Sequence, residues 1–384
     1  MMVSKTKLFL LYLAMIISLI MYVPSIYNSG LYDVLRYIEF GVMGLLVMTT
    51  FSFSTIRKYR FTSILGVILV FLLIEFLVFF AFLLNKNTDD LIQIVIVFLM
   101  LIAGINSSID EPALIRLCTV YSIGTVFLGA ISVITYLGSF SLSIDQYAIS
   151  GKNQVGAIVA FGAGLSFYLS YCHTKGYMFS FILAIVGIIL SIVIRCRTAM
   201  VALLLLVIYI VARKWNLKQI VFFAIVLATL YLVFFNTIND FLLEIFIGHG
   251  DIEVSNNQDD YLNSLSTNRF ERNALGVAFL VGHPLTGELG ELSHIPLIHN
   301  YVLLRLVRYG VFALPFLLIY CLFLIKCLRM LFKGRLSLGN MGWILLSIPL
   351  FCSLLEPSAP FGPGTVQLMP FLLCGLAVRN EKAK

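Results

Sequence analysis

Long runs of apolar residues constrain this chain more than any other feature of its sequence. A helix that crosses a bilayer needs about 20 mostly apolar residues. The sequence contains about 12 such candidate transmembrane helices, at residues 8–27, 33–53, 61–84, 91–105, 112–138, 153–172, 177–194, 198–212, 218–235, 300–326, 341–356 and 364–379. Only 12% of the residues are charged, whereas soluble domains carry about 25%. We therefore expect an all-α polytopic integral membrane protein in which residues 1–384 form a single membrane domain.

The lysine and arginine residues predict how these helices are oriented. Cytoplasmic loops of membrane proteins are enriched in both residue types. If the N-terminus is cytoplasmic, most of the 26 lysines and arginines fall on the cytoplasmic side, which predicts that both termini are cytoplasmic. Most of the exceptions gather in three places on the other side, and they are Lys152, Arg195, Arg197, Arg269, Arg272, Arg305 and Arg308. A positive cluster that departs from the topology rule predicts an anionic ligand at the extracytoplasmic face.

Several other interpretations fit the sequence less well. The apolar run after Lys5 and Lys7 could be a cleaved signal peptide, but no small-residue cleavage site follows it, so we interpret it as the first span. The seven cysteines include no C-x-x-C pair, which argues against a disulfide framework and against a metal site. No basic run with interleaved aromatic residues occurs outside the cytoplasmic loops, so nucleic acid is not an expected partner.

Residues 236–299 form an extracytoplasmic loop between the ninth and tenth expected spans. Loops longer than about 12–15 residues are usually functional or disordered. Asn268, followed by Glu271 three residues later, resembles a capping box at the start of a helix. The helix that follows is amphipathic, with Phe270, Ala274, Val277 and Val281 on one face and Arg269, Arg272, Asn273 and Gly276 on another. We expect it to lie against the membrane surface.

The end of this loop, "PLIHNYVLLRLVRYG" at 296–310, contains the best candidate for a catalytic residue. A histidine with a pKa near 6.5 is largely neutral at pH 7, so His299 can accept a proton from a hydroxyl group. Asn300 is a plausible N-cap of the tenth span, whose free N–H groups would attract an anion. Alternatively, His299 is an ordinary interfacial residue, because His249, His283 and His294 lie in the same loop.

The arginines allow two interpretations each. Arg305 and Arg308 share a helix face that points away from His299, and Arg308 lies about 13 Å further along the axis. They either line a groove for a lipid phosphate or reach back to the membrane interface. Arg195 and Arg197 are outside in the expected topology, but they could form a cytoplasmic turn if one short span were absent. Lys152 with Asn153 could bind the same anion or simply begin a helix.

Arginine binds phosphate through paired N–H donors. A lipid-linked diphosphate sugar would unify these features, because its lipid needs the membrane, its diphosphate needs the arginines and its sugar projects outward.

The motifs themselves resemble a known family. The run "NRFERNALGVAFLVGHPLTGELG" followed by "HNYVLLRLVRYG" is similar to the signature region of the O-antigen polymerase and O-antigen ligase superfamily. The matching positions are Arg269, Pro284 to Gly287, His299, Asn300 and Gly310, together with Arg197 in "RCRTA" and Asn153 in "GKNQVG". The motifs cover about residues 155–310. One departure is Asn273, which stands where the family often has an aromatic residue, so Arg272 could take the role of Arg269.

The resemblance implies a function and a mechanism. The protein would be a C-type glycosyltransferase of the bacterial cytoplasmic membrane that needs no metal and no cofactor. It would transfer a polyprenyl-diphosphate-linked oligosaccharide to a lipid-linked acceptor at the extracytoplasmic face, so polymerising O-antigen or capsular repeat units. His299 would be the general base, and Arg197 and Arg269 would bind the diphosphate.

From charge and placement we add further substrate-binding candidates, which are Lys152, Asn153, Arg195, Arg272, Asn300, Arg305 and Arg308. A flippase and a chain-length regulator are the expected protein partners. The alternatives are a ligase that transfers the glycan to lipid A core, and a flippase or transporter of lipid-linked sugars.

Overall fold

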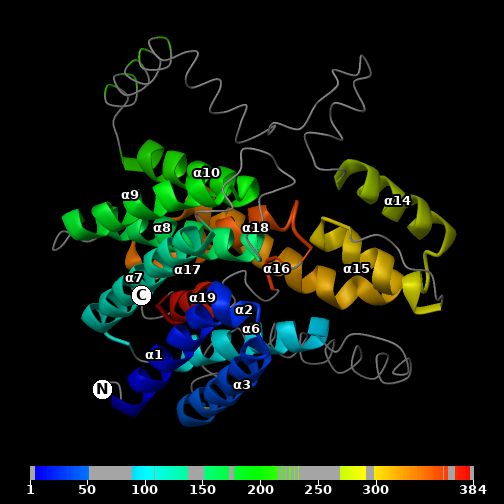
Figure 1. The fold of residues 1–384 in the computed structure, drawn as a ribbon, viewed down its shortest axis with the longest axis horizontal. Coiled ribbons are helices and arrows are strands. Elements are labelled where there is room, and N and C mark those ends of the chain that lie inside the picture. Colours follow the sequence, from blue (N-terminus) through cyan, green and yellow to red (C-terminus); the bar gives the residue numbers. More distant parts are fainter. Residues whose placement is uncertain are drawn as a thin grey trace.

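The structure, a computed structural model, describes residues 5–51, 89–107, 109–136, 151–172, 177–214, 269–290, 298–357, 359–361 and 368–380, with scattered positions between 218 and 232. Every regular element in this part of the chain is helical, and the described residues contain no strand (Figure 1). The expected all-α class is therefore confirmed.

Four helical segments of the described chain are long and apolar enough to cross a membrane. They are α7 (Glu111–Tyr136), α8 (Lys152–Cys172), α9 (Tyr177–Ile194) and the segment Tyr301–Lys333. Shorter apolar helices cover Thr6–Ile20, Gln93–Asn106, Leu338–Cys352 and Leu368–Arg379. These segments fit a multi-pass membrane protein. The expected number of spans stays a prediction, because residues 61–84 lie outside the described chain and 218–235 is described only at scattered positions.

The remaining helices follow the expected apolar runs with small shifts at their ends. They are α1 (Lys5–Ile20), α2 (Pro24–Tyr27), α3 (Leu31–Thr50), α6 (Asp89–Asn106), α10 (Arg197–Lys214), α14 (Arg269–Gly282), α15 (Tyr301–Tyr309), α16 (Leu314–Lys333), α17 (Met341–Leu345), α18 (Ser347–Cys352) and α19 (Leu368–Asn380). The run expected at 341–356 is therefore two short helices that are followed by a non-helical end at Ser353 to Glu356.

Helix α8 is the centre of the hydrophobic core. Every residue from Val155 to Leu169 is buried, and α7, α9, α10 and α18 pack around it (Figure 1). Small residues let the helices approach closely, as is usual where helices associate in lipid. Gly162 of α8, for example, faces Thr125 of α7 so closely that no Cβ would fit. Backbone approach of this kind also joins α6 to α19 at Gly104 and Gly375.

The expected tenth span is interrupted at Gly310. Helix α15 ends there, and a short 3-10 helix, η4 (Gly310–Ala313), precedes α16. Gly310 and Gly287 both have a φ of 56°, a conformation that glycine adopts without strain. Their backbones lie against each other, and the N–H of Val311 donates to the Leu285 carbonyl at 3.2 Å. The Pro-Leu-Thr-Gly turn thus packs on the end of α15, which accounts for both glycines of the motif.

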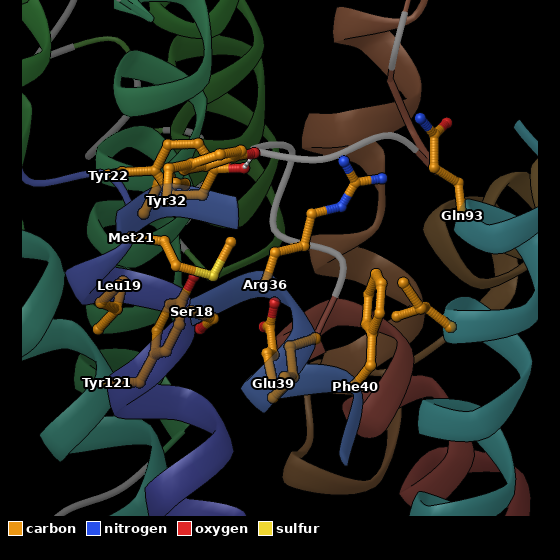
Figure 2. Close-up of a pocket in the computed structure, with 13 residues that line it drawn as sticks. Ser18, Leu19, Met21, Tyr22, Tyr32, Arg36, Glu39, Phe40, Gln93 and Tyr121 are labelled. Atoms are coloured by element: carbon orange, nitrogen blue, oxygen red, sulfur yellow. Dashed lines mark hydrogen bonds between the residues drawn. The ribbon is translucent and has the colours of Figure 1, made fainter. Parts of the chain in front are cut away.

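A small polar cavity of about 30 Å³ lies between α1, α3, α6 and α7 (Figure 2). Arg36 and Glu39 extend into it from α3, and Gln93 lines it from α6. On another side, the hydroxyl groups of Tyr22 and Tyr32 lie 3.5 Å apart. Glu39 is only 7% exposed, and the cavity has room for one or a few water molecules. Water in this cavity would solvate a carboxylate that is otherwise costly to bury in a membrane protein.

Candidate functional site

Helix α14 packs on α15 through the side that carries Gly276 and, further along, the apolar residues Phe279 and Leu280. Gly276 is buried against Ile298 and Val307, where a Cβ would not fit. The opposite side is apolar and exposed, with Val277 at 49% and Val281 at 78%. The amphipathic helix expected in the loop is therefore present, and its exposed apolar side suits a membrane surface. The proposed capping residue Asn268 lies outside the described residues, as does most of the loop before it.

Asn300 is the N-cap of α15, as expected. Its Oδ1 accepts a hydrogen bond from the N–H of Leu303 at 2.9 Å. Its Nδ2 donates to the carbonyl of Leu354 at 3.1 Å, and the next N–H, that of Tyr301, donates to the carbonyl of Ser353 at 3.0 Å. The start of α15 is thus fixed to the chain that leaves α18, and this contact determines where His299 lies.

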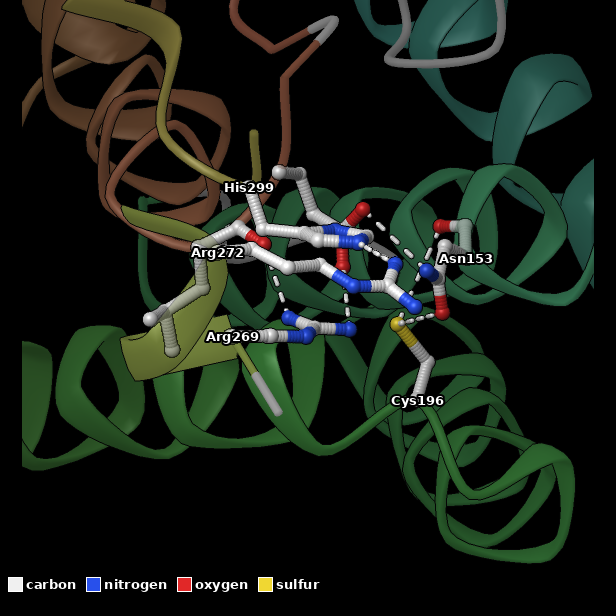
Figure 3. Close-up of polar contacts among 7 residues, drawn as sticks. Asn153, Cys196, Arg269, Arg272 and His299 are labelled. Atoms are coloured by element: carbon white, nitrogen blue, oxygen red, sulfur yellow. Dashed lines mark hydrogen bonds and ion pairs between the residues drawn. The ribbon is translucent and has the colours of Figure 1, made fainter. Parts of the chain in front are cut away.

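His299 faces Arg272 of α14. The Arg272 Nη1 lies 3.3 Å from the His299 Nε2 (Figure 3). A guanidinium group only donates hydrogen bonds, so Nε2 is the acceptor and the imidazole proton is on Nδ1. That Nδ1 is buried and has no hydrogen-bond partner among the described residues. The basic nitrogen therefore faces the arginines.

The surroundings of His299 keep it neutral. Burial, and then the charges of Arg269 and Arg272, lower the pKa of His299 from 6.5 to about 4. At pH 7 the imidazole is therefore uncharged and able to accept a proton. An anion bound at the two arginines would offset their charges and raise this pKa, which would make His299 a stronger base when a ligand is present.

Glu356 links the site to the body of the protein. Its Oε1 forms an ion pair with the Arg269 Nη2 at 3.2 Å, and its Oε2 accepts a hydrogen bond from the Asn153 Nδ2 at 3.1 Å. Arg269 also donates from Nη1 to the carbonyl of Leu355 at 2.7 Å. Asn153 lies in turn beside Cys196, whose thiol is 3.7 Å from the Asn153 carbonyl (Figure 3). Four separate segments of the chain meet at this carboxylate.

Glu356 was not among the site residues predicted from the sequence. A carboxylate directly after an apolar run, in "LLEPS", is the signal that could have identified it, since such groups are costly near a membrane and usually have a partner. Glu356 is 7% exposed, and its partner Arg269 lies 87 positions earlier in the sequence. No local pattern links residues so far apart.

Lys152 lies near this carboxylate, and two more of the expected cations, Arg195 and Arg197, lie near Lys152. Lys152 begins α8, and the charges of Arg195, Arg197 and Arg269 all act on it. Burial lowers the pKa of Arg197, and the charge of Arg269 lowers it further. Arg195 has a φ of 58°, a left-handed conformation that costs a non-glycine residue about 1–2 kcal/mol. Strain of this kind often accompanies a functional residue.

Arg305 and Arg308 have different surroundings. Arg305 is 2% exposed, and its guanidinium lies 4.8 Å from the ring centre of Tyr301 and 5.3 Å from that of Phe316. These cation–π contacts stabilise the buried guanidinium. Arg308 is partly buried in the last turn of α15. A role for either residue in substrate binding stays a prediction.

Comparison with known proteins adds no assignment. No family model matches the chain, and no curated protein matches it. Within the described residues, no group of three or more His, Cys, Asp and Glu side chains could hold a metal ion. We therefore infer function from the motifs and from the geometry of one cluster, which we call the basic site. Its members are Lys152, Asn153, Arg197, Arg269, Arg272, His299 and Glu356.

Proposed function

We propose that this protein is a membrane glycosyltransferase that polymerises lipid-linked oligosaccharide repeat units with a polyprenyl-diphosphate-linked donor. The observation that carries the proposal is a neutral histidine in hydrogen-bond contact with Arg272, beside the partly buried Arg269 and Arg197. A general base next to a diphosphate-binding cluster is what glycosyl transfer from a diphosphate requires. The resemblance to the O-antigen polymerase and ligase superfamily supports the same chemistry. The reaction would occur at the extracytoplasmic face of the bacterial cytoplasmic membrane.

The mechanism follows from the hydrogen bonds of the basic site. His299 takes the proton of an acceptor hydroxyl on Nε2 while that oxygen bonds to the anomeric carbon of the donor sugar. The bond from this carbon to the diphosphate breaks, and its electron pair leaves with the diphosphate. Arg197 and Arg269 neutralise the charge that develops on this leaving group. The proton then passes from His299 to solvent or to the released diphosphate.

Arg272 connects donor binding to this step. Without a ligand, its Nη1 occupies the lone pair of the His299 Nε2 at 3.3 Å. A diphosphate is a stronger acceptor for a guanidinium than an imidazole is. Donor binding would draw Arg272 onto the phosphate oxygens and leave Nε2 available for the acceptor hydroxyl. Glu356 would keep Arg269 and Asn153 in place through its two carboxylate oxygens.

The direct test is elongation of a lipid-linked oligosaccharide by purified protein. We expect His299→Ala to lower kcat by about 10²–10⁴, the usual contribution of general base catalysis. The control is His283→Ala, because His283 lies close to α14 but stacks on Phe279 outside the basic site. We expect Arg197→Ala and Arg269→Ala to raise the KM for the donor. Elongation at the wild-type rate by a folded His299→Ala variant would contradict the proposal, and transfer to lipid A core would indicate a ligase.

A further inference from the structure

An apolar groove of about 310 Å³ runs along the body of the protein between α10, α16 and α18. Its walls include Leu205 and Tyr209 of α10, Leu324 and Leu328 of α16, and Leu350 and Leu354 from α18 and the chain after it. Leu205, Leu328 and Leu354 are 48%, 40% and 49% exposed. The groove is thus open on one side, and in a membrane that side would face lipid. We call it the α10–α16 groove.

The end of this groove that is lined by Leu354 and Ala202 lies next to the basic site. Leu354 lines the groove, and its carbonyl accepts the hydrogen bond from Asn300. The next carbonyl, that of Leu355, accepts the hydrogen bond from Arg269. On the opposite wall, α10 begins at Arg197, and Ala202 of the groove is about 7.5 Å further along the same helix. On each wall of the groove, the apolar residues therefore lie next to an arginine of the basic site, which is Arg269 on one wall and Arg197 on the other.

The other end of the groove is closed by polar contacts. The hydroxyl group of Tyr209 donates to the carbonyl of Leu331 at 2.8 Å. Arg213 donates to the same carbonyl at 2.8 Å and to that of Phe332 at 2.6 Å. From Tyr320 to Leu331, which both line the groove, α16 rises about 16 Å. The groove is therefore apolar and about 16 Å long, with arginines next to one end and polar contacts closing the other.

We propose that the α10–α16 groove binds the diphosphate-proximal part of the donor's polyprenyl chain. This inference rests on the proposed function, since that function supplies the diphosphate at Arg197 and Arg269. A polyprenyl diphosphate has its dianionic group covalently attached to a hydrocarbon chain, so a site for one needs cations and an apolar channel in direct continuity. Leu354 of the groove is followed directly by Leu355, whose carbonyl accepts the hydrogen bond from Arg269 of the basic site, and this link provides that continuity.

The test is the binding of undecaprenyl diphosphate and of inorganic diphosphate to the purified full-length protein in phosphatidylcholine nanodiscs. Leu205→Trp places a bulky side chain in the groove. Leu204→Trp is the matched control, because Leu204 is the adjacent leucine of α10, is 57% exposed and does not line the groove. We expect Leu205→Trp to weaken undecaprenyl diphosphate binding at least about tenfold and to leave inorganic diphosphate unaffected. Leu204→Trp should change neither.

A second pair of variants, on the facing helix α16, tests whether any effect of Leu205→Trp is due only to local misfolding of α10. Leu328→Trp should weaken undecaprenyl diphosphate binding as Leu205→Trp does. Ile325, which is 62% exposed on α16 and does not line the groove, supplies the control, and Ile325→Trp should leave binding unchanged. Equal undecaprenyl diphosphate affinity in all four variants would overturn the inference and would leave bilayer phospholipid as the occupant. Loss of inorganic diphosphate binding in both groove variants would also overturn it. Selective loss of the prenyl ligand in a protein that elongates no glycan would uphold the groove and refute the proposed function.

Discussion

The body of the molecule and its outer part, helix α14, are held together in different ways. The body is one large apolar cluster in which helices approach closely through glycine, as α6 and α19 do at Gly104 and Gly375. Between α14 and α15 there is a much smaller apolar cluster of Ile298, Leu304 and Val307. Helix α15 belongs to the body, because Tyr301 and Tyr309 lie in its core. Helix α14 is joined to the body by the small cluster and by the ion pair and hydrogen bond of Arg269.

This difference separates stability from chemistry. Arg269 and Arg272 lie on this outer helix, and His299 at the start of α15 faces them. An anionic ligand would compete for the few polar contacts that the two arginines make. Small rearrangements there leave the apolar core intact. Substitutions in the body should therefore change folding, and substitutions in the outer part should change activity.

The largest effect is expected in the body. Gly104→Leu would force a side chain into the backbone of Leu372, Gly375 and Leu376, where no flexible group can move aside. We expect a loss of about 3 kcal/mol or more of stability, at the upper end for overpacked sites. Gly44→Leu is the control, because a Cβ at Gly44 of α3 meets nothing within 4 Å. Thermal unfolding in detergent measures both, and equal melting temperatures would contradict the close packing of α6 on α19.

A smaller effect is expected from Arg272, and it concerns the pH dependence of the reaction. The pKa of His299 is about 4 in the folded protein because of burial and two arginines. The acid limb of kcat/KM should therefore lie near pH 4 instead of 6.5. Arg272→Gln removes one positive charge, so the limb should move to higher pH, whereas Arg272→Lys should leave it nearly unchanged. An unchanged limb in Arg272→Gln would show that Arg272 does not act on His299.

The same pKa gives His299 a pH-dependent effect on stability. The unfolded chain binds the proton between pH 6.5 and pH 4 and the folded chain does not. Stability therefore falls as the pH falls through that range, and the effect is absent above pH 6.5. Arg272→Gln should reduce this loss.

The smallest effect is expected at Arg195, where strain and charge can be separated. Arg195→Gly relieves the left-handed conformation, so it should stabilise the fold by about 1 kcal/mol. Arg195→Ala removes the same charge and keeps the strain. If the charge matters for the anion, both variants should weaken inorganic diphosphate binding a few-fold, while only the glycine variant should melt at a higher temperature. Wild-type affinity in both would exclude Arg195 from the site.

The sequence predicted local structure well and contacts between distant segments poorly. Apolar runs located α7, α8 and α9 within a few residues, and residue type identified the Asn300 cap, because both depend on neighbours along the chain. The break at Gly310 was not predicted, since it depends on a turn more than 20 positions earlier. The same holds for Glu356, for the Arg272–His299 contact and for the burial of Arg305 between two rings. Each of these contacts arises only when the helices pack.

The most direct test of the proposed function is to measure prenyl diphosphate release and glycosidic bond formation together. Purified protein would be given a polyprenyl-diphosphate-linked repeat unit, with lipid and glycan products quantified in the same samples. The proposal predicts one prenyl diphosphate released for each new glycosidic bond, and a loss of about 10²–10⁴-fold in the rate of both products with a folded His299→Ala variant. Glycan elongation without prenyl diphosphate release, or equal yields from wild type and His299→Ala, would contradict it.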